Sequence, residues 1–337
     1  MKKIVFLETT DLEKEILQKY PGFLEKIDSF EEKLTLENSK KFKDYEVVST
    51  FISSQLSAET LKELVNLKFI ATRSTGFDHI DLNYCKNHNI VVSNVPSYGS
   101  HTVAEYTFAL LLCLIRKVYN SYQRIRESGS FAIEGLRGEE LFGKTIGIIG
   151  TGRIGTEVIK IAKGFSMNVL AYDKYLEEDL AQELNFQYVA LEDLLSKSDI
   201  ITLHVPYNKE THHLLNKDNL SKVKKGAYII NTARGGIIET QALYKALKNG
   251  QIAGAALDVL EEEGDLIEEQ RMLLEKENIP PEKLKNLLAN HIFIDLDNVI
   301  ISPHNAFNTK EALENIVITT IENIDNYLEG KQINLVN

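Results

Sequence analysis

The sequence predicts an α/β protein built from two domains, each with a parallel β-sheet. Three observations lead to this prediction. The chain has 337 residues, of which 43% are hydrophobic, so it is too long for one ordinary core and has enough apolar side chains for two. Short apolar runs typical of strands alternate with amphipathic helical patterns, as in parallel α/β units. This alternation starts again with stronger signals from Gly143, so a second domain begins before that residue.

In the first hundred residues, each helical pattern follows polar residues that are suited to capping. Strands are expected at 3–7, 45–51, 69–73 and 90–93, and helices near 12–20, 58–67 and 81–88. Residues 31–42 are charged and weakly periodic, so no element is expected there. The helical stretch over about 101–125 is expected to run between the two domains as one rigid helix.

In the second half, the expected strands are almost continuously apolar, which is typical of a parallel sheet covered on both faces. Strands are expected at 145–150, 168–173, 200–206, 227–232, 252–260 and 298–302, and helices at 153–165, 284–288 and 311–328. Residues 261–277 are rich in acidic side chains and are followed by two prolines, so they are expected to form a surface insertion. The role of segment 264–297 does not follow from the sequence. The last helix is expected to pack on the first domain.

Composition excludes several classes of partner. The formal charge of −11 argues against nucleic acid and against an anionic membrane surface, because both bind basic faces. No stretch approaches the roughly 18 apolar residues that span a bilayer, and the apolar run after Lys3 is too short for a secretory signal. Cys85 and Cys113 lie in helical patterns without metal-binding spacing, so we expect free thiols, no metal and a cytoplasmic protein.

A glycine motif follows the first strand of the second domain and begins a helix. In Gly150-Thr151-Gly152-Arg153-Ile154-Gly155, the three glycines suit a tight turn, a close approach of a pyrophosphate to the backbone, and helix-on-strand packing. The helix N-terminus would bind the anion. Asp173 ends the next strand roughly 20 residues later, where a carboxylate can accept the ribose hydroxyls, which favours NAD over NADP. The alternative is that Asp173 only caps the following turn.

Arg234 follows an apolar strand and precedes two glycines. Residues at the carboxyl ends of parallel strands face the ligand crevice of an open sheet, so this guanidinium is expected to point there. Arginine can hold a carboxylate with two parallel hydrogen bonds and keeps its charge, which suits a 2-keto or 2-hydroxy acid. The alternative is a surface arginine at a strand end.

His304 follows the last expected strand, and an acidic run that includes Glu263 ends the strand before it. Interconversion of a hydroxyl and a carbonyl moves one proton as the hydride moves, and imidazole exchanges protons near neutral pH. A carboxylate beside His304 would favour its protonated form and orient the ring. Seven other histidines compete with it, among them His79, His101 and the pair His212 and His213, and a structural role is the alternative.

Together these motifs resemble the D-isomer-specific 2-hydroxyacid dehydrogenase family over nearly the whole chain. The matching segments are 72–81 (TRSTGFDHID), 94–98 (NVPSY), 102–105 (TVAE), 146–155 (IGIIGTGRIG), 204–206 (HVP), 231–235 (NTARG), 256–259 (ALDV) and 302–304 (SPH). Arg234, Glu263 and His304 match the family's Arg, Glu and His in order and motif. The long segment between Glu263 and His304 is most similar to the D-lactate dehydrogenase branch. Many members have proline where this chain has Gly264, so the neighbouring Glu261 and Glu262 stay as alternatives to Glu263.

The resemblance implies a flavodoxin-like substrate domain over 1–98 and 305–337, and a Rossmann NAD-binding domain over 99–304. It implies a homodimer that interconverts a small 2-keto acid and a D-2-hydroxy acid with NAD, with pyruvate and D-lactate as the expected pair. The alternatives are a dehydrogenase of the 2-hydroxyisocaproate or glycerate type and a nicotinamide-sensing binding protein. A methyltransferase with a similar glycine loop is a further rival, which would leave Asp173 and the Arg–Glu–His series without a purpose.

The resemblance also implies residue roles. Arg234 would hold the substrate carboxylate and polarise the keto oxygen, and His304, kept protonated by Glu263, would donate the proton. The cofactor contacts would be Gly150, Gly152, Arg153, Ile154, Gly155, Asp173, Val205, Pro206, Thr232, Ala233 and Asp258. The substrate contacts would be Thr75, Gly76, Tyr98, Arg234 and Phe307.

Overall fold

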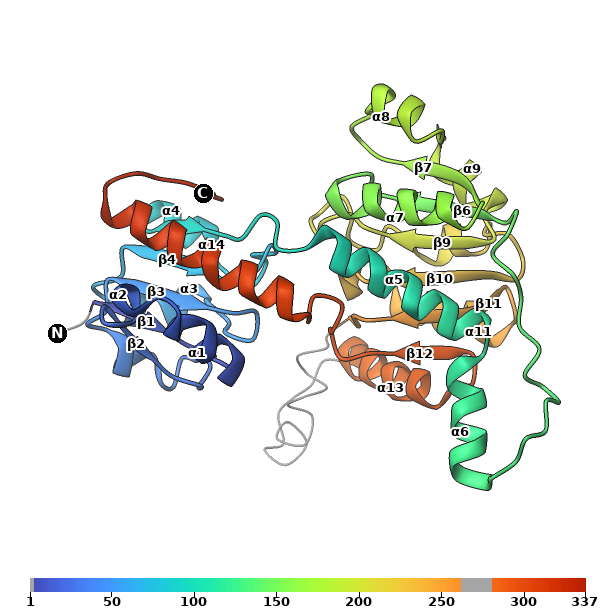
Figure 1. The fold of residues 1–337 in the computed structure, drawn as a ribbon, viewed down its shortest axis with the longest axis horizontal. Coiled ribbons are helices and arrows are strands. Elements are labelled where there is room, and N and C mark those ends of the chain that lie inside the picture. Colours follow the sequence, from blue (N-terminus) through green and yellow to red (C-terminus); the bar gives the residue numbers. More distant parts are fainter. Residues whose placement is uncertain (1–2, 262–280) are drawn as a thin grey trace. The chain divides into compact units, whose positions relative to one another are not determined.

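The structure, a computed structural model, describes residues 3–261 and 281–337. The chain divides into two compact units (Figure 1). One comprises Met1–Gly99 with Asn308–Asn337, and the other comprises Ser100–Phe307. Each unit holds one sheet in which neighbouring strands pair in parallel. The predicted fold class, two parallel α/β domains, is therefore confirmed.

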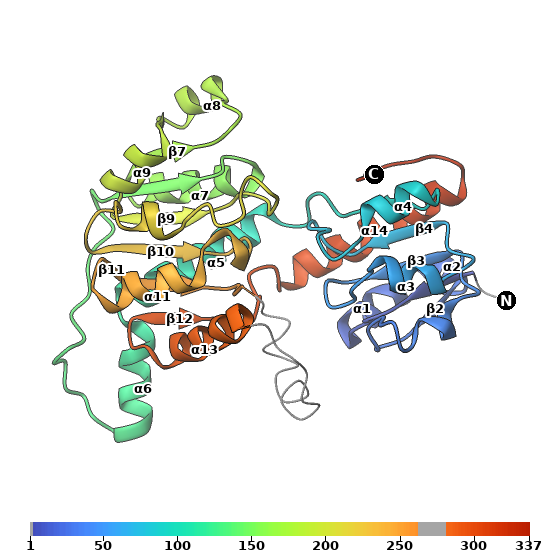
Figure 2. The same ribbon diagram turned by 180° about the vertical axis from the view of Figure 1, so that it is seen from behind.

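The first unit has a five-stranded sheet in the order β2-β1-β3-β4-β5. Its strands are β1 (Ile4–Phe6), β2 (Ile27–Ser29), β3 (Val47–Thr50), β4 (Phe69–Thr72) and β5 (Val91–Ser93). Its helices are α1 (Asp11–Gln18), α2 (Pro21–Leu24), the 3-10 helix η1 (Ser39–Phe42), α3 (Ala58–Glu63), α4 (Leu82–Asn87) and α14 (Lys310–Leu328). Helices α1, α2 and α14 cover one face of the sheet, and α3 and α4 cover the other (Figures 1 and 2).

Apolar side chains explain why the last helix belongs to the first unit. Val317, Ile321 and Ile324 of α14 are buried in one cluster with residues of β1 and β4. The Tyr327 ring stacks on Phe69 of β4, with 4.2 Å between ring centroids. A helix with this apolar stripe is stable only when the stripe is buried against another element.

A buried ion pair ties together residues that lie in or just after three strands of the first unit. The Arg73 side chain is fully buried, and its Nε donates to Glu13 Oε1 at 2.8 Å. Its Nη2 donates to the carbonyl oxygens of Leu7 at 2.6 Å and Glu8 at 3.0 Å, and its Nη1 donates to Ser49 Oγ at 3.1 Å. Because four protein oxygens replace water around the guanidinium, the charge is tolerated in the core.

The second unit has a seven-stranded sheet in the order β12-β11-β10-β9-β6-β7-β8. Its strands are β6 (Thr145–Ile149), β7 (Asn168–Tyr172), β8 (Gln187–Tyr188), β9 (Ile200–Leu203), β10 (Ala227–Asn231), β11 (Ile252–Leu257) and β12 (Val299–Ile301). Its helices are α5 (Ser100–Ile115), α6 (Val118–Ser128), α7 (Arg153–Gly164), α8 (Glu178–Glu183), α9 (Leu191–Lys197), α10 (Lys217–Leu220), the 3-10 helix η2 (Gly235–Ile237), α11 (Thr240–Lys248) and α13 (Pro281–Asp295). Helices α5 and α7 cover one face, and α9, α11 and α13 cover the other (Figures 1 and 2).

The prediction of one continuous helix over 101–125 is wrong. Helix α5 ends at Ile115 and α6 begins at Val118, because Lys117 between them takes a left-handed conformation with φ 53°. A returning segment supplies the physical reason: the Glu139 backbone N–H donates to the Ile115 carbonyl at 3.1 Å. A Cβ at Gly138 would lie 2.5 Å from that same oxygen, so the approach requires glycine there.

Three short elements in the first unit, α2, β2 and η1, were not expected from the sequence. Strand β2 has only three residues, and η1 lies in the charged segment 31–42. This segment nevertheless supplies Leu34 and Phe42 to the core, and both are fully buried. The two cysteines are free, as predicted; Cys85 is buried and Cys113 is half-buried. None of the helices that the structure describes has the length and hydropathy of a membrane span.

The buried ion pair allows a test of what holds the first unit together. We expect Glu13→Gln to lower the free energy of unfolding by about 3–5 kcal/mol, because it leaves the Arg73 charge buried without a counter-charge. Urea unfolding followed by circular dichroism measures the change. Glu192→Gln, which removes the partner of the exposed Lys222, is the matched control and should have no resolvable effect. Equal stability of Glu13→Gln and the wild type would contradict a stabilising role of the Glu13–Arg73 ion pair.

Candidate active site

The register of the second sheet aligns the carboxyl ends of its strands. Ile149 pairs with Leu203, Leu203 with Asn231, Asn231 with Leu257, and Leu257 with Ile301. The last residues of β6, β9, β10, β11 and β12 therefore lie in one row across the sheet. The segments that carry the predicted cofactor and catalytic residues of this unit start from this row or, for Asp173, from the end of β7.

The glycine motif forms the turn between β6 and α7. Gly150 has φ 98°, which L side chains rarely adopt, and a Cβ there would lie 2.7 Å from the backbone of His204. A Cβ at Gly155 would lie 1.9 Å from the Gly150 carbonyl oxygen, so this glycine allows the helix to approach the strand. A Cβ at Gly152 would meet nothing within 4 Å, and no side chain caps the helix that begins at Arg153. This open helix N-terminus fits a pyrophosphate.

Asp173 lies one residue after β7 and is bonded to the glycine turn. Its Oδ2 accepts from the Thr151 N–H at 2.6 Å and from the Thr151 hydroxyl at 3.1 Å. Its Oδ1 accepts from the Tyr175 N–H at 3.0 Å. The carboxylate thus caps its own turn and also orients the turn between β6 and α7. Each oxygen can accept a further hydrogen bond, so these contacts are compatible with the expected ribose contact.

His204, Val205 and Pro206 follow β9 beside the glycine turn. The His204 N–H donates to the Ile149 carbonyl at 2.7 Å, and its Nε2 lies 2.9 Å from the Thr202 hydroxyl. Burial lowers the pKa of His204 to about 3, so this imidazole is neutral near pH 7 and is no proton donor for catalysis. Val205 is half-buried, and a Cβ at Gly150 would lie 2.9 Å from its Cγ1, whereas Pro206 is exposed.

Arg234 lies three residues beyond β10, in a turn that the Asn231 side chain stabilises. The Asn231 side chain accepts from the Ala233 N–H at 3.0 Å and donates to the Arg234 carbonyl at 2.9 Å. The Arg234 Nη1 donates to the Ala233 carbonyl at 2.8 Å. Asn231 is buried, so this turn is fixed from inside the sheet, while Arg234 is half-buried. The hydroxyl of Thr232 is engaged with the Thr107 hydroxyl of α5 at 2.9 Å.

Asp258, the first residue after β11, organises the loop that carries His304. Asp258 is 1% exposed, and its Oδ1 accepts from the Ser302 hydroxyl at 2.5 Å and the Asn305 N–H at 2.8 Å. Its Oδ2 accepts from the Ala306 N–H at 2.8 Å, and its carbonyl accepts from the His304 N–H at 2.8 Å. These four bonds enclose His304, which is held at φ 50°. The family resemblance implied a cofactor contact for Asp258, and the sequence gave no sign of this anchoring.

Phe307 lies in the loop that carries His304 and packs against the imidazole ring. The rings of His304 and Phe307 meet edge to face, with centroids 6.4 Å apart. Phe307 belongs to the second unit. The structure thus brings together His304, Phe307 and Asp258. Arg234 follows β10, which pairs with β11 on the side opposite β12.

Glu263 lies outside the described residues. Of its two alternatives, Glu262 also lies outside them, whereas Glu261 is described. The Glu261 carboxylate bonds with His213 and Thr240, so both of its oxygens are engaged within this unit. These partners leave Glu263 and Glu262 as candidates for the carboxylate beside His304.

The candidate substrate residues of the first unit follow β4 and β5. The exposed Thr75 donates through its hydroxyl to the Val95 carbonyl at 2.7 Å, and the half-buried Gly76 accepts from the Ser74 hydroxyl at 2.6 Å. The Tyr98 carbonyl accepts from the Asn315 side chain at 3.0 Å. Within residues 3–261 and 281–337, no group of three or more His, Cys, Asp or Glu side chains is arranged to hold a metal ion.

Comparison with known proteins gives a family. The family model described as "D-isomer specific 2-hydroxyacid dehydrogenase, NAD binding domain" matches residues 108–306. The chain is 37% identical to the D-lactate dehydrogenase of Escherichia coli (strain K12) over 332 residues, which is 98% of each protein.

Solved structures agree with this match. The chain superposes on the D-lactate dehydrogenase of Aquifex aeolicus, solved with NAD and lactic acid, with a TM-score of 0.86 and 37% identity, covering 99% of this chain and 98% of that one. It superposes on a D-2-hydroxyisocaproate dehydrogenase with a TM-score of 0.83 and 28% identity, covering 99% of each chain. The chain therefore belongs to the D-isomer-specific 2-hydroxyacid dehydrogenase family and is an NAD-dependent oxidoreductase.

Proposed function

We propose that this enzyme interconverts pyruvate and D-lactate, and that Arg234, Glu263 and His304 are its catalytic group. The observation that carries the proposal is the register of three adjacent strands, in which Asn231 pairs with Leu257 and Leu257 with Ile301. Because of this register, one guanidinium and one imidazole follow strands that flank β11. They lie at the same edge of the sheet as the glycine turn.

The chemistry assigns a separate task to each residue. The bound nicotinamide supplies the hydride in keto-acid reduction and accepts it in the reverse direction. The Arg234 guanidinium binds the substrate carboxylate and polarises the keto oxygen, which gains negative charge as the carbonyl is reduced. The protonated His304 donates its proton to that oxygen, and the Glu263 carboxylate stabilises the imidazolium before this transfer. In the oxidation of the hydroxy acid, neutral His304 takes the proton back.

Two observations favour D-lactate over a bulkier hydroxy acid. The two D-lactate dehydrogenases described above share 37% identity with this chain over nearly its full length, whereas the D-2-hydroxyisocaproate dehydrogenase shares 28%. The Phe307 ring, which packs edge to face on His304, is proposed to bound the space beside the imidazole. An aromatic ring there leaves less room for a branched side chain. A 2-hydroxyisocaproate dehydrogenase remains the second candidate.

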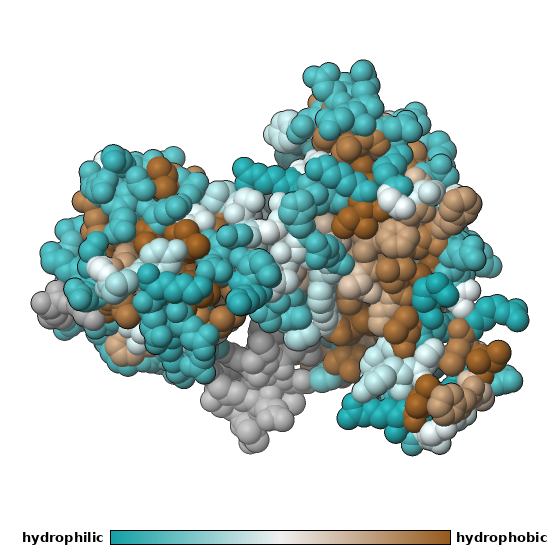
Figure 3. All heavy atoms as spheres, in the orientation of Figure 1, coloured by the Kyte–Doolittle hydropathy of each residue, from teal (hydrophilic) through white to brown (hydrophobic). Residues whose placement is uncertain are grey.

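We further propose that the enzyme is a cytoplasmic homodimer formed by the second unit. Large apolar side chains are exposed on α6 and the segment after it, namely Val118, Tyr119, Tyr122, Ile125, Phe131, Ile133 and Phe142. Figure 3 shows apolar residues gathered on this face of the second unit, over α5 and α6. Phe131 is 81% exposed and Ile133 is 79% exposed. Contiguous apolar surface of this kind favours a protein partner. The free Cys85 and Cys113 suit a reducing compartment.

The substrate is tested with a panel of 2-keto acids of increasing side-chain size, assayed by NADH oxidation. We expect pyruvate to have the highest kcat/KM, with hydroxypyruvate and 2-keto-4-methylpentanoate below it. NADPH should be at least about tenfold less efficient than NADH, because the Asp173 carboxylate would repel a 2′-phosphate. A maximum at the branched acid would favour the second candidate, and absence of turnover with every keto acid would contradict the proposed reaction.

The carboxylate-binding role of Arg234 is tested by Arg234→Lys. We expect kcat/KM for the keto acid to fall by roughly 100-fold, because a compact ammonium cannot form the two parallel hydrogen bonds. The Kd for NADH, measured by nucleotide fluorescence, should change little and serves as the internal control. Full catalytic efficiency in this variant would remove Arg234 from the proposed mechanism.

The dimer is tested by sedimentation velocity of a double variant, Phe131→Glu with Ile133→Glu. Two carboxylates in the apolar patch should convert the enzyme to a monomer, because they would be desolvated on association. Val65 in the first unit is also exposed, at 74%, so Val65→Glu is the matched control and should remain dimeric. A wild-type enzyme that sediments as a monomer would refute the proposal.

A further inference from the structure

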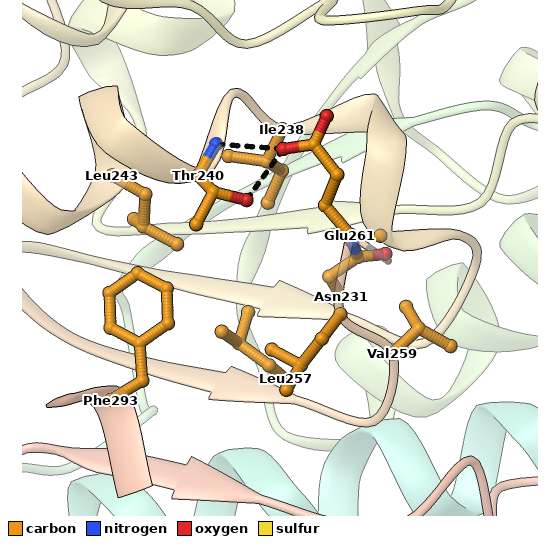
Figure 4. Close-up of a pocket in the computed structure, with 10 residues that line it drawn as sticks. Asn231, Ile238, Thr240, Leu243, Leu257, Val259, Glu261 and Phe293 are labelled. Atoms are coloured by element: carbon orange, nitrogen blue, oxygen red, sulfur yellow. Dashed lines mark hydrogen bonds between the residues drawn. The ribbon is translucent and has the colours of Figure 1, made fainter. Parts of the chain in front are cut away.

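The Glu261 carboxylate bonds to His213 and to the start of α11, and Figure 4 shows its bonds to Thr240. Its Oε1 is 2.7 Å from His213 Nε2, and its Oε2 accepts from the Thr240 hydroxyl at 2.6 Å. Oε2 also lies 3.4 Å from the Thr240 backbone N–H, at the first residue of α11, where the helix dipole favours an anion. Only 14% of the Glu261 side chain is exposed, so the bonds are largely shielded from water. Because a carboxylate only accepts, Nε2 of His213 carries the hydrogen.

The backbone of Glu261 is held as firmly as its side chain. Its carbonyl accepts from the Asn290 side chain of α13 at 2.9 Å. On the other side, a Cβ at Gly235 would lie 2.0 Å from the Leu260 carbonyl carbon and 2.2 Å from the Glu261 nitrogen. The residue directly after Arg234 is therefore in backbone contact with the segment that Glu261 anchors.

The segment that contains His213 and Leu215 is bonded to the connection between β10 and α11, which also contains Arg234. The His213 N–H donates to the Gly236 carbonyl at 2.9 Å. Leu215 forms a parallel bridge with Ile238, and its N–H donates to the Ile237 carbonyl at 3.1 Å. The connection from Arg234 to α11 is thus packed between the His213 segment on one side and the Leu260–Glu261 backbone on the other. The His213–Glu261 bond joins these two sides across it.

Beneath the carboxylate lies a small pocket whose floor is apolar. Figure 4 shows Leu257 and Phe293 below Glu261 and Thr240, and Leu243 beside Thr240. Asn231 also lines this pocket, and its side chain bonds with the Ala233 N–H and the Arg234 carbonyl. Without the His213 bond, Thr240 would be the remaining side-chain partner of the carboxylate among the described residues.

We propose that His213 and Glu261 are positioning residues for Arg234, and that their bond fixes the connection after β10 so that the guanidinium is held in its catalytic position. This inference rests on the role proposed above for Arg234. Neither residue touches the reacting atoms in this scheme. A displacement of a substrate-binding group by about 1 Å can cost roughly 100-fold in rate, so a bond that restrains this connection has a large effect on turnover.

The chain offers a matched control next to His213. His212 is the same residue type, stacks on His213 with ring centroids 3.8 Å apart, and bonds through Nδ1 to the Tyr207 hydroxyl at 3.0 Å. The bond to Glu261 is made by His213 and not by His212. A variant at His212 therefore disturbs the same segment and leaves the proposed bond in place.

The experiment compares His213→Ala, His213→Gln, Thr240→Val and His212→Gln in the full-length enzyme. Each variant is assayed with the 2-keto acid that the wild type reduces most efficiently, and the Kd for NADH is measured in parallel. We expect His213→Ala and Thr240→Val to lower kcat/KM by at least about tenfold with NADH affinity within about twofold of wild type. His213→Gln, whose amide N–H can replace Nε2–H, should recover most of the loss, and His212→Gln should behave as wild type.

The outcomes separate a positioning role from a structural one. Wild-type kcat/KM in His213→Ala would overturn the inference. So would a loss in His213→Gln as large as in His213→Ala, or a parallel loss of NADH affinity, because either indicates general disruption. Circular dichroism of each variant at the assay temperature identifies unfolding, in which case Thr240→Val decides. If Arg234→Lys retains the wild-type kcat/KM and His213→Ala does not, the proposed role of Arg234 is wrong. The His213–Glu261 bond would then still be shown to affect turnover.

Discussion

The parallel hydrogen-bonded register of the second sheet is the constraint on which the candidate site depends. Five strands far apart in the chain end in one row, because Ile149, Leu203, Asn231, Leu257 and Ile301 are successive register partners. A shift of one residue in any pair would turn the side chains after that strand to the opposite face. The buried apolar residues on both faces of these strands oppose such a shift. Core packing therefore also sets the position of the chemistry.

Side chains at or just after the strand ends then shape each connection. Asn231 folds the turn before Arg234, Asp258 encloses the loop around His304, and Asp173 binds the glycine turn through Thr151. Each uses a carboxylate or amide to satisfy backbone N–H groups that no longer have strand partners. These polar residues therefore hold the backbone at the edge of the sheet where the ligands are expected. Asp258 holds one loop with both of its carboxylate oxygens.

The sequence could predict the fold class and the identity of the motifs, but not these pairings. The expected strand over 200–206 ends at Leu203, and Val205 packs beside Gly150. The apolar pattern does not show this change, since valine and proline continue it. The bonds of Glu261 to His213 and Thr240 join residues 48 and 21 positions apart, and no local spacing reveals them. Similarly, the break after Ile115 depends on a segment that returns more than 20 residues later.

The organisation of the exposed apolar surface has a consequence for association. Arg124 of α6 donates through Nη1 to the carbonyl oxygens of Ala132 at 2.7 Å and Glu134 at 2.8 Å, which ties the segment bearing Phe131 and Ile133 to the helix within a single chain. The conformational freedom of this segment is therefore already reduced before a second molecule arrives. Recognition by such a preorganised surface loses less entropy than recognition by a loose loop. In the proposed dimer, two folded chains would therefore meet as nearly rigid bodies.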